Sequence, residues 1–336
     1  MDEREVVLTV DALTKHFPVR GARFGREGKV VRALDGVSFE LRKGETLGIV
    51  GESGCGKSTL ARTIVGLETP TSGAVRFRGA DLHGLRGRER DDMRRRVQIV
   101  LQDPYSSLNP RRTVQETLLQ PFQIHPDVVP RAKRLPRVKE LVELVGLNPD
   151  HLDRYPFQFS GGQRQRIGIA RALALSPEVI VCDEPVSALD VSVQAQVVNL
   201  LQRLQRELGL AYVFIAHDLS VVRHISDRIG VMYLGKVAEL GERGLVYDSP
   251  AHPYTDALLA AVPIPDPAAR GVERALLAGD PPSPVNPPSG CRFRTRCTRA
   301  QDICAVEEPI LHSIEPLGAR DVACHFPLIP ENTLAR

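Results

Sequence analysis

Short apolar runs alternate with helix-like segments over the first three quarters of the chain. Val37, Phe39 and Leu41 alternate with polar residues, which is the pattern of a half-buried strand. Continuous apolar runs with the length of buried strands occupy residues 46–50, 97–101, 179–182, 211–215 and 229–233. We therefore predict an α/β fold between about residues 6 and 246, in which helices cover a mainly parallel sheet.

Two segments predict helices between these strands. Residues 57–65 follow the run 46–50 and end at Gly66, a residue that commonly terminates a helix. Between residues 193 and 208 apolar positions recur in steps of three and four, as on a helix that faces a core. This stripe consists of Val193, Val197, Leu200, Leu201, Leu204 and Leu208.

Composition changes after Ala261. Eight prolines lie between residues 262 and 288, and this density prevents long regular structure. Four of the six cysteines follow, at Cys291, Cys297, Cys304 and Cys324. We predict two units, residues 1–250 and residues 251–336, the second containing a proline-rich connector and a cysteine-rich tail.

Charge and hydropathy narrow the class of protein. The 336 residues are 42% hydrophobic and 25% charged, as in a soluble globular protein, and the net charge is only +3. No apolar stretch approaches the roughly 18 residues of a membrane span, and residues 1–5 do not resemble a secretory signal. The arginine-rich segment 86–96 contains no aromatic residue, so we interpret it as a solvated face rather than a nucleic-acid site. We expect a cytoplasmic protein.

A glycine-rich loop carries the strongest chemical signal. The pattern G-x-x-x-x-G-K-[ST] is matched by Gly51-Glu52-Ser53-Gly54-Cys55-Gly56-Lys57-Ser58-Thr59. Glycines let the backbone wrap an anion at the start of a helix, and the loop lies between a predicted strand and a predicted helix. Lys57 would reach the β- and γ-phosphates of a nucleotide, and Ser58 would offer its hydroxyl to magnesium. A plain glycine turn is the alternative.

Two acidic residues end a second apolar run. Asp183 and Glu184 directly follow residues 179–182. In a chain with a phosphate-binding loop, Asp183 is the expected ligand of magnesium, and Glu184 can polarise an attacking water. Taken alone, the same pattern would more often mark an ordinary solvated strand end.

Further motifs resemble those of ABC-type ATPases, in the order found in that family. The segment Phe159-Ser160-Gly161-Gly162-Gln163 resembles the family's signature motif, with Phe159 where most members have Leu. Gln102 matches the glutamine loop and His217 the switch histidine. The D-loop corresponds to Ser187-Ala188-Leu189-Asp190. Phe17 matches the adenine-stacking aromatic residue, which is more often Tyr, although a core position is the alternative for Phe17.

Other segments narrow the resemblance to the ATPases of oligopeptide and dipeptide importers. These segments are residues 102–111, His252-Pro253-Tyr254-Thr255, and the tail from 281–284 through 291–297. An importer for another small solute such as a metal ion is one alternative. A non-transport ABC ATPase is another, but such proteins usually contain a long coiled coil or two cassettes, and this chain shows neither.

The resemblance implies a mechanism shared between two ATPase subunits. Nucleotide on residues 51–59 of one subunit would be covered by Ser160, Gly161, Gly162 and Gln163 of a sister ATPase. Magnesium would be bound through Ser58, Gln102 and Asp183, while Glu184, Gln102 and His217 would serve catalysis. His217 would also contact the γ-phosphate of ATP. A helical subdomain at about residues 103–175 would pass motion to two membrane permeases, which an extracytoplasmic peptide-binding protein supplies. The subunit would lie on the cytoplasmic face of the membrane and would bind no nucleic acid.

The tail cysteines have the spacing C-x5-C-x6-C-x19-C. Zinc sites usually contain a closer pair, and the spacings of ferredoxins also differ from this one. Resemblance to importers with such a tail implies that Cys291, Cys297, Cys304 and Cys324 bind a 4Fe–4S cluster, with zinc and free thiols as the alternatives. We expect a structural site whose loss leaves ATP binding at Lys57 largely intact.

Overall fold

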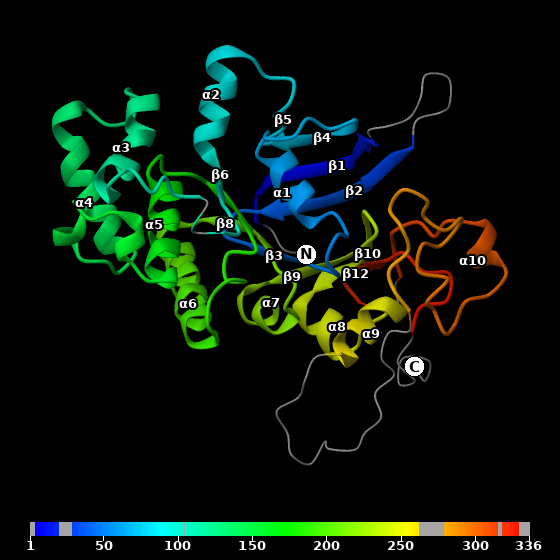
Figure 1. Ribbon diagram of the computed structural model, residues 1–336. Helices are drawn as coiled ribbons and strands as arrows, with labels where there is room; N and C mark the ends of the chain where they lie inside the picture. Colours follow the sequence, from blue (N-terminus) through cyan, green and yellow to red (C-terminus); the bar gives the residue numbers. More distant parts are fainter. Residues whose placement is uncertain are drawn as a thin grey trace.

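Two β-sheets organise the chain in the computed structural model, which describes residues 4–19, 29–103, 105, 107–261, 279–314 and 318–328 (Figure 1). The smaller sheet is antiparallel and has the strand order β2-β1-β4-β5. Its strands are β1 (Val6–Pro18), β2 (Val30–Arg42), β4 (Ser72–Phe77) and β5 (Ala80–Asp81). The alternation at residues 37–41 is the central part of β2, which pairs with β1 through partners such as Val10 and Phe39.

The larger sheet has the order β11-β12-β10-β9-β3-β8-β7-β6. Neighbours from β9 to β6 run parallel, as the apolar runs predict, whereas β10, β12 and β11 are antiparallel to their neighbours. The parallel strands are β9 (Arg228–Tyr233), β3 (Thr46–Val50), β8 (Ala211–Ile215), β7 (Val179–Asp183) and β6 (Val97–Val100). The remaining strands are β10 (Lys236–Glu242), β12 (Arg320–Val322) and β11 (His312–Ser313).

Ten α-helices surround these sheets within the described residues. Figure 1 shows α3, α4 and α5 gathered at one end of the molecule and the cysteine-rich tail at the other. The helices are α1 (Lys57–Ile64), α2 (Gly87–Arg96), α3 (Val114–Ile124), α4 (Arg134–Leu144), α5 (Gly161–Leu173), α6 (Val191–Leu208), α7 (Leu219–Ile225), α8 (Arg243–Asp248), α9 (Pro253–Ala260) and α10 (Ile303–Val306). None of the helices in the described ranges is long and apolar enough to cross a membrane.

The two faces of the parallel strands bury different cores. Successive residues of a strand point to opposite faces, so Ile180 and Cys182 of β7 belong to one cluster and Val179 and Val181 to the other. The first cluster includes buried residues of α5, α6 and α7, and the second includes those of α1 and of the small sheet. The strands are buried on both faces, which explains why they read as continuous apolar runs.

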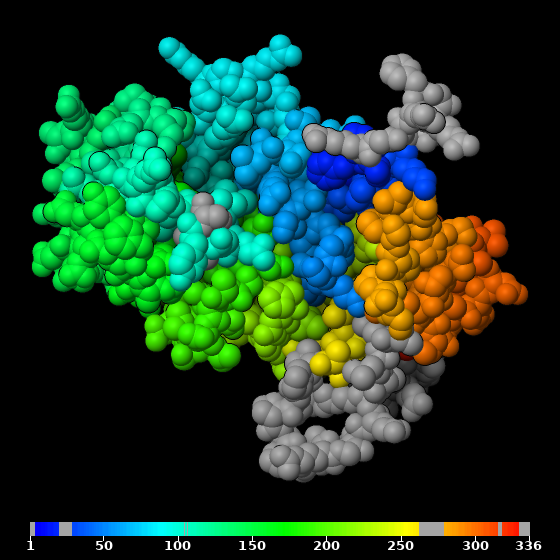
Figure 2. Space-filling view, viewed as in Figure 1, coloured from blue at the N-terminus to red at the C-terminus, as the bar shows by residue number. Residues whose placement is uncertain are grey.

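The C-terminal tail joins the large sheet. Strand β12 pairs with β10 through Glu239 and Val322, and Arg320 lies buried beside the carboxylate of Glu239. Figure 2 shows the orange and red tail packed beside the blue N-terminal part of the chain. The part of the predicted proline-rich connector at residues 262–278 lies outside the described residues.

Candidate functional site

The glycine-rich loop follows β3 and leads into α1. Gly51 has φ 154° and Gly56 has φ 109°, so both hold left-handed backbone that favours glycine. A Cβ at Gly51 would meet the carbonyl oxygen of Met232 at 2.1 Å, and one at Gly56 would meet that of Ala33 at the same distance. The backbone therefore approaches neighbouring strands closely, and the chain can wrap an anion at the start of α1 only with glycine at these positions.

Lys57 points back into this loop. Its ammonium group donates hydrogen bonds to the carbonyl oxygens of Gly51 at 2.7 Å and Glu52 at 3.0 Å, and the residue is 4% exposed. Lysine carries three donors and no acceptor, so a buried ammonium inside a loop of amide groups is suited to phosphate oxygens.

Ser58 and Asp183 bring oxygen donors together beside the loop. The Ser58 hydroxyl donates to Asp183 Oδ1 at 3.0 Å, and Asp183 is buried at the end of β7. Burial raises the pKa of the Asp183 carboxyl, and the hydrogen bond from Ser58 opposes that rise. A hydroxyl and a carboxylate are the ligand types that Mg²⁺ prefers, so the donor set fits this ion.

Two of the predicted catalytic residues converge on the carboxylate of the third, Glu184. The Gln102 side-chain amide donates to Glu184 Oε2 at 2.8 Å, and His217 Nδ1 lies 3.6 Å from the same oxygen. Glu184 has φ 46°, which is unusual for a residue with a side chain, and its N–H donates to Ile215 O at 2.9 Å. Strands β7 and β8 thus fix the Glu184 backbone, while the His217 side chain remains 58% exposed.

A cavity of about 370 Å³ connects the loop with these residues. Phe17 of β1 lines the cavity, which places it at the site rather than in the core, and the Lys15 ammonium lies 4.7 Å from the centre of its ring. The other residues anticipated by the sequence that line it are Ser53, Gly54, Gly56, Lys57, Ser58, Thr59, Gln102 and Glu184. Gly51, Glu52, Cys55, Asp183 and His217 lie outside this lining set.

Sequence reasoning missed three residues of the cavity wall. Val31 and Ala33 belong to β2, and Pro284 belongs to the described part of the proline-rich connector; the Pro284 carbonyl accepts a hydrogen bond from Arg32 N at 3.1 Å. No motif marks Val31 or Ala33, and the segment 281–284 resembles peptide-importer ATPases without indicating a place at the nucleotide cavity. Pro284 lies about 250 positions from these β2 residues in the sequence, so only the tertiary structure shows that the three line one cavity.

The signature-like segment does not line the cavity of its own chain. Ser160 caps α5: its hydroxyl accepts from Gln163 N at 3.3 Å, and Gln163 Oε1 accepts from Ser160 N at 3.0 Å. A Cβ at Gly162 would lie 2.3 Å from Val193 Cγ1 of α6. Asp190 is exposed and its carbonyl accepts from the first turn of α6.

The four tail cysteines line one small cavity of about 10 Å³ together with Arg294 and Arg299. Burial raises the pKa of Cys291 and Cys297, and it raises that of Cys324 to about 11. Within the described ranges, no group of three or more His, Cys, Asp or Glu residues has the arrangement of a metal-ion site.

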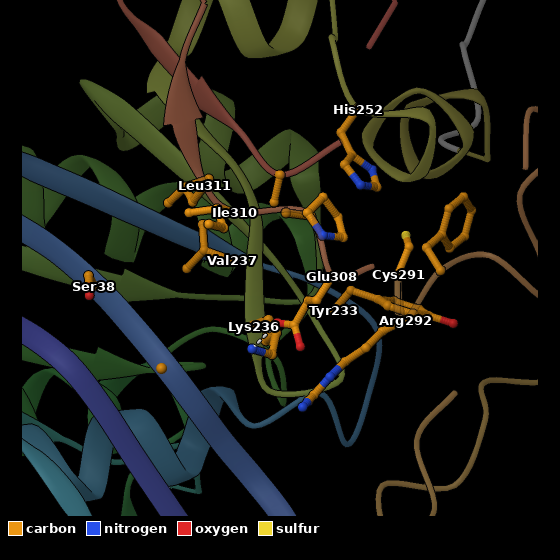
Figure 3. A pocket seen from close by; sticks show the side chains of 15 residues that line it. Ser38, Tyr233, Lys236, Val237, His252, Cys291, Arg292, Glu308, Ile310 and Leu311 are labelled. Carbon is orange, nitrogen blue, oxygen red and sulfur yellow. Dashed lines mark ion pairs between the residues drawn. The ribbon is translucent and has the colours of Figure 1, made fainter. Parts of the chain in front are cut away.

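A larger cavity of about 380 Å³ lies between residues of β10 and part of the tail (Figure 3). It shares no lining residue with the cavity at the glycine-rich loop. Figure 3 shows Cys291 and Arg292 of the tail beside Tyr233, with the ion pair between Lys236 and Glu308 at the other side. This cavity marks the seam along which the tail packs onto the sheet.

Comparison with known proteins identifies the family. Residues 34–187 match the family model described as ABC transporter, and residues 238–304 match the oligopeptide/dipeptide transporter C-terminal region. A putative oligopeptide transport ATP-binding protein of Bacillus subtilis, YkfD, is 58% identical over 321 residues, which cover 95% of each chain. The chain belongs to the family of ABC transporter ATPases. The predicted P-loop fold and ATP-hydrolysing activity are therefore confirmed.

Further relatives place this ABC ATPase among similar cassettes. The oligopeptide transport ATP-binding protein OppF of Salmonella typhimurium is 54% identical over 314 residues, which cover 93% of this chain and 94% of that one. Among solved structures, the dimeric post-hydrolysis state of the ATP-binding cassette MJ0796 with ADP and Pi has a TM-score of 0.62 and 30% identity. That match covers 70% of this ABC ATPase and 98% of the cassette.

Proposed function

We propose that this ABC ATPase energises the uptake of oligopeptides or dipeptides through a membrane permease. The observation that carries the proposal is the match of residues 238–304 to the oligopeptide/dipeptide transporter C-terminal region. The relatives described as oligopeptide transport ATP-binding proteins cover the same tail, since their alignments span 93–95% of this chain.

In this proposal each residue of the nucleotide site has a separate role. Lys57 binds the β- and γ-phosphates, and Phe17 stacks on adenine. Ser58, Asp183 and Gln102 would bind Mg²⁺, which neutralises charge on the phosphate oxygens when it is bound. Glu184 accepts the proton of the attacking water while Gln102 and His217 orient its carboxylate; the distances of 2.8 and 3.6 Å support this arrangement.

The second half of the site comes from a sister ATPase. We place its Ser160, Gly161, Gly162 and Gln163 over the nucleotide and its Asp190 at the dimer contact. The position of the signature outside its own cavity supports this, as does the capped N-terminus of α5, because a helix N-terminus attracts anions. Two permeases and an extracytoplasmic peptide-binding protein complete the complex, with the ATPase on the cytoplasmic face.

We propose two domains with separate functions. Residues 1–250 form the ATPase domain, with a helical subdomain at about 103–175 that faces the permease. Residues 251–336 form the extension typical of peptide importers. The gathering of α3, α4 and α5 away from the tail supports the separate subdomain (Figure 1).

The test of the transport function is uptake in cells that lack this chain. Labelled di- and oligopeptides should accumulate when the wild-type gene is restored and should not accumulate with Glu184→Gln at equal protein level. Unchanged peptide uptake together with lost uptake of a metal ion would instead favour the alternative importer.

We further propose that Cys291, Cys297, Cys304 and Cys324 bind a 4Fe–4S cluster. Their convergence on one cavity with Arg294 and Arg299 supports this, because thiolate sulfurs are the ligands of such clusters and cations offset their charge. Protein purified without oxygen should be brown and contain about four irons and four sulfides per chain. One zinc and no iron would favour the zinc alternative, and neither metal would leave free thiols.

A further inference from the structure

Glu52 of the glycine-rich loop is bound by residues that follow position 250. Its backbone N–H donates to the Tyr254 hydroxyl at 3.0 Å, and its carboxylate pairs with Arg296 of the tail. Glu52 therefore joins the phosphate-binding loop to the C-terminal extension across more than 200 positions of sequence.

The ion pair between Arg296 and Glu52 is bidentate, and this geometry orients both the guanidinium and the carboxylate. One guanidinium nitrogen lies 2.7 Å from Glu52 Oε2 and the other lies 2.9 Å from Oε1. The Arg296 side chain is 5% exposed and that of Glu52 is 21% exposed. Paired hydrogen bonds between guanidinium and carboxylate are stronger and more directional than single ones, so Arg296 fixes the Glu52 side chain.

The same residue contacts the lysine of the loop. The Glu52 carbonyl oxygen is one of two backbone acceptors of the Lys57 ammonium. Glu52 is thus held at its N–H, its side chain and its carbonyl, and the third contact involves the cation that binds phosphates. A shift of Glu52 would change the position of Lys57.

The positive charge of Arg296 has a second effect, on the electrostatics of the phosphate-binding loop. An unpaired Glu52 carboxylate beside the loop would repel the phosphates of ATP, because like charges in a partly buried site interact strongly. Arg296 neutralises that carboxylate.

We propose that Arg296 is a positioning residue for ATP binding, so that the C-terminal extension sets the nucleotide affinity of the phosphate-binding loop through Glu52. This inference rests on ATP binding by the chain and is independent of the solute transported. It departs from the expectation of a tail with a purely structural role, because Arg296 directly precedes Cys297 and touches the loop itself.

The test compares two tail arginines that both anchor the extension. Arg292 is 7% exposed and bonds to Asp35 and the Leu234 carbonyl, neither of which belongs to the loop. Arg296→Met keeps most of the side-chain volume and removes the charge, and Arg292→Met is the matched control. Binding of a fluorescent ATP analogue to the purified full-length chain gives Kd. We expect about a tenfold rise for Arg296→Met and less than about a threefold rise for Arg292→Met.

A second variant separates the effect of Glu52 from loosened docking of the tail. In Glu52→Gln/Arg296→Met the repelling carboxylate is gone, so Kd should fall below that of Arg296→Met, and the remaining rise over wild type measures the lost positioning of Glu52. Unchanged affinity in Arg296→Met would overturn the proposal. An equal loss in Arg292→Met would overturn it as well, because the effect would then arise from docking of the tail alone.

Discussion

Glu184 combines an uncommon backbone conformation with a fixed side chain. Its φ of 46° lies in the left-handed region, and its carbonyl accepts from both the N–H and the hydroxyl of Ser187. Strained backbone persists only where the surrounding structure determines it, and here it turns the carboxylate toward Gln102 and His217.

Glu184→Gln should bind ATP with nearly wild-type affinity and lose turnover. The amide retains the shape of the side chain but cannot accept the proton of water, so kcat should fall by at least about 100-fold. Steady-state phosphate release and equilibrium nucleotide binding measure the two quantities. Hydrolysis near the wild-type rate in the assembled complex would remove Glu184 from its proposed role.

His252 gives the folded chain a dependence on pH. Burial lowers the pKa of its imidazole from 6.5 to about 4, and its Nδ1 accepts from Tyr254 N at 3.0 Å. Between these values the unfolded chain binds a proton that the folded chain excludes, so the free energy of unfolding falls as pH is lowered. The loss is at most about 3 kcal/mol.

His252→Asn should flatten this part of the profile. Asparagine offers an oxygen to the same N–H and does not titrate. Urea unfolding of both proteins at pH 7.5, 6 and 4.5 measures the slopes. Equal slopes for variant and wild type would show that His252 is not the titrating group.

At the scale of elements, α5 and α6 meet through a glycine. A Cβ at Gly162 would be only 2.3 Å from Val193 Cγ1. The first turns of the two helices therefore approach more closely than an alanine at position 162 would allow. The contact with Val193 requires glycine at position 162 for packing, in addition to the role in nucleotide binding that the signature motif predicts for Gly162.

Gly162→Ala should lower the free energy of unfolding by roughly 1–2 kcal/mol, because the steric cost exceeds the gain in helix propensity. Val193→Ala removes the clashing methyl group. The double variant should therefore be more stable than the sum of the single effects, as a double-mutant cycle from urea unfolding would show. Additive effects would mean that the helices separate freely at this point.

Elements buried on both faces could be predicted from the sequence, and partly exposed ones could not. The apolar runs located β3, β6, β7, β8 and β9 to within one or two residues. Strand β1 was not predicted because its burial is irregular and its register shifts repeatedly against β2. Strand β12 has three residues and depends on pairing with β10, so no periodicity could indicate it.

The same distinction applies to the site. Residues within short motifs were predicted, since their spacing follows from the geometry of a loop and a helix. Ala33, Pro284 and Arg296 reach the loop from distant segments, and only tertiary packing brings them there. Two residues of the apolar stripe on α6 are less buried than the sequence predicts. Val193 is only partly buried and Leu208 is 48% exposed, because both lie near the ends of the helix.

At the scale of the whole molecule, the nucleotide cavity is a one-sided site. Lys57, Ser58 and Glu184 line it, while Ser160 and its neighbours lie elsewhere on the same chain. Under the proposed mechanism a second ATPase subunit supplies the signature residues, so the isolated chain should be a weak ATPase whose specific activity rises with protein concentration. Constant specific activity over about a hundredfold dilution would indicate a self-sufficient site.

The junction of β10 and β12 also has a consequence for how the protein is made. Glu239 is fully buried, and the guanidinium of Arg320 that faces it lies 81 positions later in the chain. During translation β10 leaves the ribosome long before β12. Until β12 pairs with it, the edge of β10 and the carboxylate of Glu239 remain exposed to water and to other nascent chains. Strand β12 can pair with β10 only after synthesis has passed residue 322, so the edge of β10 is covered late in translation.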